Sequence, residues 1–389
     1  MAVNTLTFNQ CATLLTAINK QATGQTALTP TSTSEFVSVA QTTLATGYDT
    51  VINSISQVLS RTVFSIRPYT RKFKGLHKDN VQFGNHIRKL QVVDKAPEED
   101  NRIKLEDGKS IDQQKVNKPV VLQTNFYGEN VYQRSVTMFK DQLDVAFSSP
   151  EEFGRFVAMV LQNVSDLIEQ DHENCARMTL ANFIAGKIAG NSNIVHLVTE
   201  YNAEAGAELT SATVKKPENF VPFMKWAMAR IKTISDLMTE RTTYFHTNIE
   251  GKPVSRHTPK DMQKLYLHAG DINNMESSVL STVFNDSYLK QVDFETVNFW
   301  QSVGNPTSIS CKPVYMKEDG TLETAADNVE SAAVLGVLFD TEAMGVTTVN
   351  TWSAAAPFNA SGGYTNTFWH FTNRYYNDFT ENGVVFLMD

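Results

Sequence analysis

The most regular hydrophobic pattern in the chain begins at Ser149 and continues for about forty residues. Ser149 is a favourable N-cap, Pro150 suits the first helical position, and Glu152 completes a capping box. The apolar residues recur at the spacing of one helix face: Phe153, Phe156, Val157, Val160, Leu161, Val164, Leu167 and Ile168. The pattern predicts one long helix over residues 150–188, roughly 50 Å in length, which would form the spine of the fold.

Two segments before this helix have the composition of β-strands. Residues 81–93 and 120–136 are rich in β-branched and aromatic side chains. The stretch between them, residues 94–118, is almost wholly polar and has too few apolar residues for a core of its own. These segments predict a long antiparallel hairpin that projects from the body as an arm. Loops of this length are generally functional or disordered.

The remaining elements mix helices and strands without a regular alternation. Residues 1–60 are rich in Thr, Ser, Asn and Gln, with helical periodicity only over 49–59. Strands are predicted at 194–198, 265–268, 334–339 and 384–388, and helices at 223–238 and 272–284. The C-terminus is dense in aromatic residues, and its last apolar strand is expected to pair with earlier strands and close the fold. The pattern predicts an α+β fold.

Composition places the chain among soluble proteins. It is 41% hydrophobic and 20% charged, and no apolar run approaches the roughly 20 residues needed to cross a bilayer. The N-terminus lacks the pattern of a signal peptide. The three cysteines are far apart in the sequence, so a disulfide framework or zinc site is not expected and a reducing cytosol fits best.

Net charge is −8, but it is unevenly distributed. Residues 61–95 hold nine basic side chains against Asp79 and Asp94, a net +7 that leaves −15 for the rest of the chain. Such asymmetry predicts a partner of opposite charge. Aromatic residues are interleaved with the basic ones, a pattern typical of proteins that bind single-stranded nucleic acid, and subunit contact is the competing and favoured explanation. Both explanations remain open at this point.

No stretch of the sequence carries a convincing catalytic motif. The tripeptide at 108–110 resembles the end of a phosphate loop, but Ile103 stands where that motif requires glycine. His172 has no second histidine at helical spacing, so a metal site there is not expected. The carboxylates of Glu98 to Asp100 lie in a polar arm with nothing apolar to raise a pKa. We therefore predict no catalytic site, no cofactor and no metal.

Several segments in this order resemble one family. They are the basic run SRTVFSIRPYTRKFKG (60–75), the arm, the helix SSPEEFGRFVAMVLQNV (148–164), KLYLHAGDINNMESSVLSTVFN (264–285) and the aromatic end NTFWHFTNRYYNDFTENGVVFLM (366–388). Together they are similar to the major capsid proteins of tailed phages with the Hong Kong 97-like fold. The greatest similarity is to the head proteins of phi-29-type podoviruses.

The resemblance implies a division of the chain into the parts of that fold. These would be an N-terminal arm (1–76), an E-loop (77–136), a P-domain with the spine helix (137–196), an A-domain (197–359) and closing P-domain strands (360–389).

The resemblance also implies a structural function. Hexamers and pentamers of this chain would form an icosahedral head around double-stranded DNA, assembled in the bacterial cytoplasm and retained in the virion. A separate scaffolding protein, a portal and non-specific proximity to DNA follow from the resemblance, and no membrane partner does. The alternatives are an encapsulin-type nanocompartment shell and a cytosolic enzyme with an unrecognised site.

Two surface hypotheses follow from the charge pattern. The acidic tip of the arm would dock beside the basic run of a neighbouring subunit, which involves Glu98, Glu99, Asp100, Glu106 and Asp107 against Arg67, Arg71, Lys72 and Lys74. The polar face of the spine helix would give the shell an acidic interior face, through Asp166, Glu169 and Glu173. An acidic lining lets DNA pack without adhering to the protein.

Overall fold

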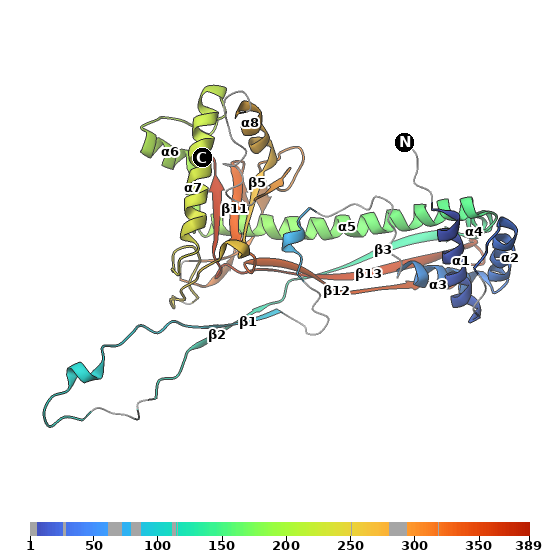
Figure 1. Ribbon diagram of the computed structural model, residues 1–389, viewed down its shortest axis with the longest axis horizontal. Helices are drawn as coiled ribbons and strands as arrows, with labels where there is room; N and C mark the ends of the chain where they lie inside the picture. The colour runs from blue at the N-terminus through green and yellow to red at the C-terminus, as the bar shows by residue number, and fades with distance from the viewer. Residues whose placement is uncertain are drawn as a thin grey trace.

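The protein is an elongated body from which a long hairpin projects (Figure 1). The computed structural model describes residues 6–25, 29–60, 72–78, 87–110, 114, 116–249, 251–279, 294–317 and 319–389. One end of the body is a compact mixed domain, the other end is a helical cluster, and the spine helix joins the two.

The helices within the described residues are α1 (Phe8–Thr23), α2 (Thr33–Leu44), α3 (Tyr48–Ser60), α4 (Lys140–Ala146), α5 (Pro150–Ala189), α6 (Leu197–Ala205), α7 (Pro217–Leu237) and α8 (Ala269–Val279). The strands are β1 (Ile87–Val92), β2 (Val121–Phe126), β3 (Glu129–Phe139), β4 (Ile194–His196), β5 (Gln263–His268), β6 (Phe294–Val297), β7 (Ile309–Cys311), β8 (Val314–Met316), β9 (Leu322–Thr324), β10 (Val329–Ser331), β11 (Val334–Asp340), β12 (Met344–Ala355), β13 (Tyr364–Asn377) and β14 (Gly383–Leu387).

The predicted spine helix is confirmed as α5, with 40 residues. Its N-cap is Ser149, whose hydroxyl accepts a hydrogen bond from the backbone N–H of Glu152 at 3.2 Å. The predicted capping box is only half formed, because the carboxylate of Glu152 pairs with Arg155 instead. Gly186 does not end the helix. A Cβ there would lie 2.5 Å from the Phe379 ring, so glycine allows close packing.

The closing strand is confirmed and lies in a five-stranded sheet of order β4-β14-β11-β5-β6. Strand β14 pairs antiparallel with β11 and parallel with β4. Because β14 lies between two earlier strands, the C-terminal segment completes the sheet. The strands predicted at 265–268 and 334–339 are its members β5 and β11.

A second sheet, of order β12-β13-β3, runs alongside α5 for much of its length (Figure 1). The strand predicted over 120–136 is therefore wrong as a single element. It divides into β2, which pairs with β1 in the arm, and β3, which pairs with β13 in the body. The division falls at Gly128, where a Cβ would lie 2.4 Å from the backbone oxygen of Tyr375. Residues 81–86 of the predicted first strand lie outside the described residues.

The N-terminal part, expected to be an arm, is folded into helices α1, α2 and α3 over its described residues up to Ser60. Its few apolar residues have helical spacing and form a core with the beginning of α5: Cys11, Leu14, Leu15, Ile18, Phe36, Val51, Ile52, Ile55, Phe153 and Val157. The polar composition concealed this pattern. Two further cores surround the C-terminal half of α5 and the long helix α7.

Two other elements differ from the sequence-based expectation. The strand predicted at 194–198 is only β4, because the chain turns into α6 at Leu197. The helix predicted at 272–284 begins earlier, as α8 at Ala269, and residues 280–284 lie outside the described residues. The amphipathic helix predicted over 223–238 is confirmed as α7.

Candidate assembly surfaces

The hairpin arm extends away from the body and carries its acidic residues at a distance from it (Figure 1). All five predicted acidic residues are exposed: Glu98, Glu99, Asp100, Glu106 and Asp107. Three of them pair with bases of the arm itself: Glu98 with Lys95 at 3.1 Å, Asp100 with Arg102 at 2.5 Å, and Glu106 with Lys109. The arm is therefore a mixed-charge surface, in which basic residues lie beside the acidic ones that the hypothesis named.

The basic residues of the docking hypothesis are only partly described. Arg67 and Arg71 lie outside the described residues. Lys72 is exposed, and its backbone N–H donates a 3.0 Å hydrogen bond to the Glu173 carboxylate of α5. Lys74 begins a short 3-10 helix (Lys74–Leu76). The end of the basic run thus lies against the spine helix.

The predicted acidic face of the spine helix is not uniform. Asp166 and Glu169 are partly exposed, whereas Glu173 is buried. Glu173 forms a 2.8 Å ion pair with Arg177, which also donates a hydrogen bond to the backbone oxygen of Phe299. Glu173 is therefore an internal contact and does not belong to the exposed face, because two other segments cover α5 at that turn.

The base of the arm is held to the body by polar contacts. From β1, Lys89 pairs with Asp378 at 2.5 Å and also with Glu381, and Gln91 donates to the hydroxyl of Thr380 at 3.0 Å. Residues 378–382, which we call the junction loop, connect β13 to β14 and are buried. The side chains of β1 that face the body therefore meet one buried polar loop.

A third contact ties the arm to the mixed domain. The Asp94 carboxylate accepts hydrogen bonds from Arg241 at 2.7 Å and from the backbone N–H of Ser255 at 2.6 Å. The bond from Ser255, together with Arg241 and Arg256, holds the pKa of Asp94 below its usual value. This carboxylate stays charged in mild acid.

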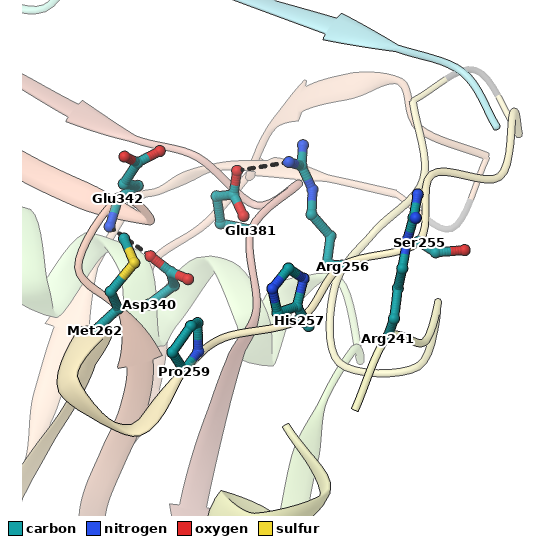
Figure 2. Close-up of a pocket in the computed structure, with 9 residues that line it drawn as sticks. All are labelled: Arg241, Ser255, Arg256, His257, Pro259, Met262, Asp340, Glu342 and Glu381. Atoms are coloured by element: carbon teal, nitrogen blue, oxygen red, sulfur yellow. Dashed lines mark hydrogen bonds and ion pairs between the residues drawn. The ribbon is translucent and has the colours of Figure 1, made fainter. Parts of the chain in front are cut away.

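A polar cavity of about 350 Å³ lies beside the junction loop. Figure 2 shows Arg256 and Glu381, joined by a 3.0 Å ion pair, among the residues that line it, which also include His257 and Asp340. Burial raises the pKa of Glu381 above its ordinary 4.5, and nearby Asp378 adds to the rise, while Lys89 and Arg256 act in the opposite direction. The cavity gives water a route to this carboxylate.

Sequence reasoning missed the junction loop and one buried lysine of α5. Lys187 is fully buried, and its Nζ has no hydrogen-bond partner in the described structure. The sequence carried one signal for this burial: Lys187 follows Phe183 by four residues, so it lies on the same apolar face of the helix. The junction loop carried only a weaker signal, the sequence DFTEN between the aromatic-rich segment and the predicted closing strand, which is typical of a solvated turn.

The described residues contain no group of three or more His, Cys, Asp or Glu side chains placed to hold a metal ion. Over the same part of the chain, no helix combines the length and apolar character that a bilayer crossing requires.

The architecture matches that of phage capsid subunits. One similar chain belongs to the capsid structure of Staphylococcus phage Andhra, with 11% identity, a TM-score of 0.54, and coverage of 85% of this chain and 87% of that one. Another belongs to the structure of the head fiber and inner core protein of bacteriophage P68, with 9% identity, a TM-score of 0.53 and the same coverage. At these identities the likeness shows the fold alone. The fold class is thus that of phage capsid proteins, as predicted.

The family is shown by the sequence as a whole. The profile of the Phi29-like phage major capsid proteins matches residues 15–387. No curated protein sequence matches the chain significantly. This chain belongs to the Phi29-like phage major capsid protein family. It is a structural component of the phage virion, and the predicted function and location are confirmed at this level.

Proposed function

We propose that this chain assembles as hexamers and pentamers into the closed icosahedral head that encloses the double-stranded DNA of a tailed phage. The observation that carries the proposal is the excess of exposed surface. The accessible area of the chain is 21575 Å², whereas a compact monomer of 43.4 kDa exposes roughly 15,000 Å². A subunit that must bury surface against its neighbours accounts for the difference.

The apolar side chains of the arm support the same proposal. Several are more than half exposed, far from any core of their own chain: Leu90, Val92, Ile103, Leu105, Val116 and Val121. Exposed apolar surface of this extent marks an interaction site. Because the arm projects away from its own body, a neighbouring subunit is the surface that it can reach.

The predicted division of the chain is retained as part of this proposal, with two adjustments. The E-loop corresponds to the hairpin of β1 and β2, and β3 is better assigned to the P-domain, because it pairs with β13. Strand β12 falls within the range expected for the A-domain (197–359), but it is also better assigned to the P-domain, because it pairs with β13. The A-domain would then comprise α6 to β11, and α5 with the sheet β12-β13-β3 would form the P-domain. A separate scaffolding protein and a portal remain proposed partners. The family match favours a capsid over an encapsulin-type shell or a cytosolic enzyme.

Within the shell, we propose that the arm docks beside the basic run of a neighbour. The acidic residues Glu98, Glu99, Asp100, Glu106 and Asp107 are all exposed on the arm, and Lys72 is exposed at the end of the basic run. Each exposed ion pair is weak and screened by salt. Repetition around a closed shell multiplies the effect.

Charge reversal tests this docking. Replacing Glu98, Glu99 and Asp100 together by Lys should reduce the yield of shells at low salt, with a smaller loss at high salt. Electron microscopy and sedimentation measure the yield. The control reverses three exposed glutamates elsewhere, Glu208, Glu218 and Glu276, with the same change in net charge. Equal yields for the two triple variants at every salt concentration would rule out a specific contact.

The exposed part of the spine helix supports a second, separate proposal. Asp166 and Glu169 would belong to an acidic interior lining that repels DNA phosphates. Their double replacement by Lys should increase the nucleic acid retained in purified shells by at least several-fold, measured by absorbance after nuclease treatment. The control is the same double change at Glu208 and Glu218. Equal retention in both double variants contradicts an interior position for this face.

A further inference from the structure

The arm is connected to the body on both of its strands, by chain continuity and a ring contact on β2 and by polar contacts on β1. Strand β2 continues directly into β3, and the ring of Phe126 contacts that of Tyr376 at 5.2 Å. Among the strands of the described residues, β1 pairs with β2 alone. A two-stranded ribbon is marginally stable by itself, so its tertiary contacts set its position. On the β1 side, the described polar contacts are those of Lys89, Gln91 and Asp94.

We propose that the junction loop is a pH-sensitive latch for the arm. When Glu381 is ionised, it and Asp378 hold Lys89, and β1 lies fixed against the body. Uptake of one proton by Glu381 removes its ion pair with Lys89, which leaves the pair with Asp378. The base of β1 can then move away from the junction loop.

The surroundings of Glu381 contain charges from every adjacent element. They are Lys89 from β1, Arg256 and His257 from the segment after α7, Asp378 and Tyr376 from the end of β13, and Asp340 and Glu342 around the end of β11. Lys187 from α5 and His246 lie on the other side of the loop, near Asp378 and Asn382. Arg241 also lines the cavity, so bases and carboxylates are mixed around Glu381. Burial and the repulsion from Asp378 favour proton uptake by Glu381, and the ion pairs with Lys89 and Arg256 oppose it.

The latch can open without unfolding the protein. Because the pKa of Glu381 is higher in the folded chain than in the unfolded one, the folded chain binds this proton more tightly. A fall in pH through that pKa therefore weakens the ion pairs of Glu381 but does not destabilise the fold through this group. The Asp94 contact persists, since its pKa is lowered. The arm is thus expected to pivot about Asp94 while it stays attached.

The test measures the distance between the arm and the body in full-length subunits, diluted below the concentration at which they assemble. Spin labels at Ser110→Cys on the arm and Glu208→Cys on the body, in a Cys311→Ser background, report that distance by pulsed electron resonance. Both labelled positions are exposed, and Cys11 and Cys175 are buried. The parent protein should give a narrow distribution of the distance between the two labels at pH 7.5. At pH 4.5 this distribution should be at least twice as wide.

Two variants separate the latch from a general effect of acid. Glu381→Gln and Lys89→Met should each give the broad distribution already at pH 7.5, with little further change in acid. Lys109→Met removes an ion pair of the arm outside the latch and should behave as the parent. Circular dichroism identifies any variant that does not fold, and Lys89→Met remains decisive if Glu381→Gln fails. A parent distribution that does not change with pH, or a Lys89→Met variant as narrow as the parent at pH 7.5, would overturn the proposal.

Discussion

Lys187 is an ionisable side chain held in an apolar part of the body. Its ammonium nitrogen lies 5.5 Å from the centre of the Phe183 ring and 5.9 Å from that of Phe379. Burial lowers the pKa of Lys187 from 10.5 to about 7, and Asp378 offsets only part of this effect. The folded chain therefore incurs a cost for charging this lysine that the unfolded chain does not.

This cost predicts a stabilising substitution. Below pH 10.5 the unfolded chain holds the Lys187 proton more tightly, so the cost grows as pH falls to about 7 and is constant below. Lys187→Met should raise the free energy of unfolding at pH 7 by several kcal/mol, at most about 5, with the gain shrinking towards pH 10. Urea unfolding of unassembled subunits across this pH range measures it. Lys215→Met, at an exposed lysine, is the control. A gain that does not change with pH contradicts the lowered pKa.

At the scale of the element, the spine helix carries one of the clearest tests of the fold. Val160 is 7% exposed and lies in the core shared with the N-terminal helices, whereas its neighbour Met159 is 61% exposed. Val160→Asp places an unpaired charge in that core and should destabilise the subunit by about 3–5 kcal/mol, with loss of soluble protein. Met159→Asp, one position along, should leave the free energy of unfolding within about 1 kcal/mol of the parent. Similar losses for both would mean that the helix face is wrongly assigned.

Elements with strong local patterns could be predicted from the sequence, and those that depend on distant contacts could not. The buried face of α5 could be predicted from the helical spacing of its apolar residues. The predicted residues that are buried in the structure are Phe153, Phe156, Val157, Val160 and Val164. The division between β2 and β3 depends on Tyr375, which is distant in sequence from Gly128. The burial of Glu173 and of the junction loop likewise depends on segments that pack over them. No local sequence pattern shows whether a segment such as residues 378–382 (DFTEN) is a buried loop or a solvated turn.

At the scale of the whole molecule, the exposed arm and the excess accessible surface are typical of a subunit that is stable only within a larger assembly. The three cores each stabilise one part of the body, and none of them includes a described residue of the arm between Ile87 and Phe126. A two-stranded ribbon with exposed apolar side chains is more stable when another surface covers it. We therefore expect the arm to lie against a neighbouring subunit in the head.

Cryo-electron microscopy of the particles formed by this chain in expressing cells tests the central claim most directly. The account predicts closed icosahedral shells of hexamers and pentamers in which each arm lies across the adjacent subunit, with Asp166 and Glu169 on the inner surface. A protein that remains monomeric or dimeric at high concentration, or shells in which each arm contacts only its own subunit, would contradict it.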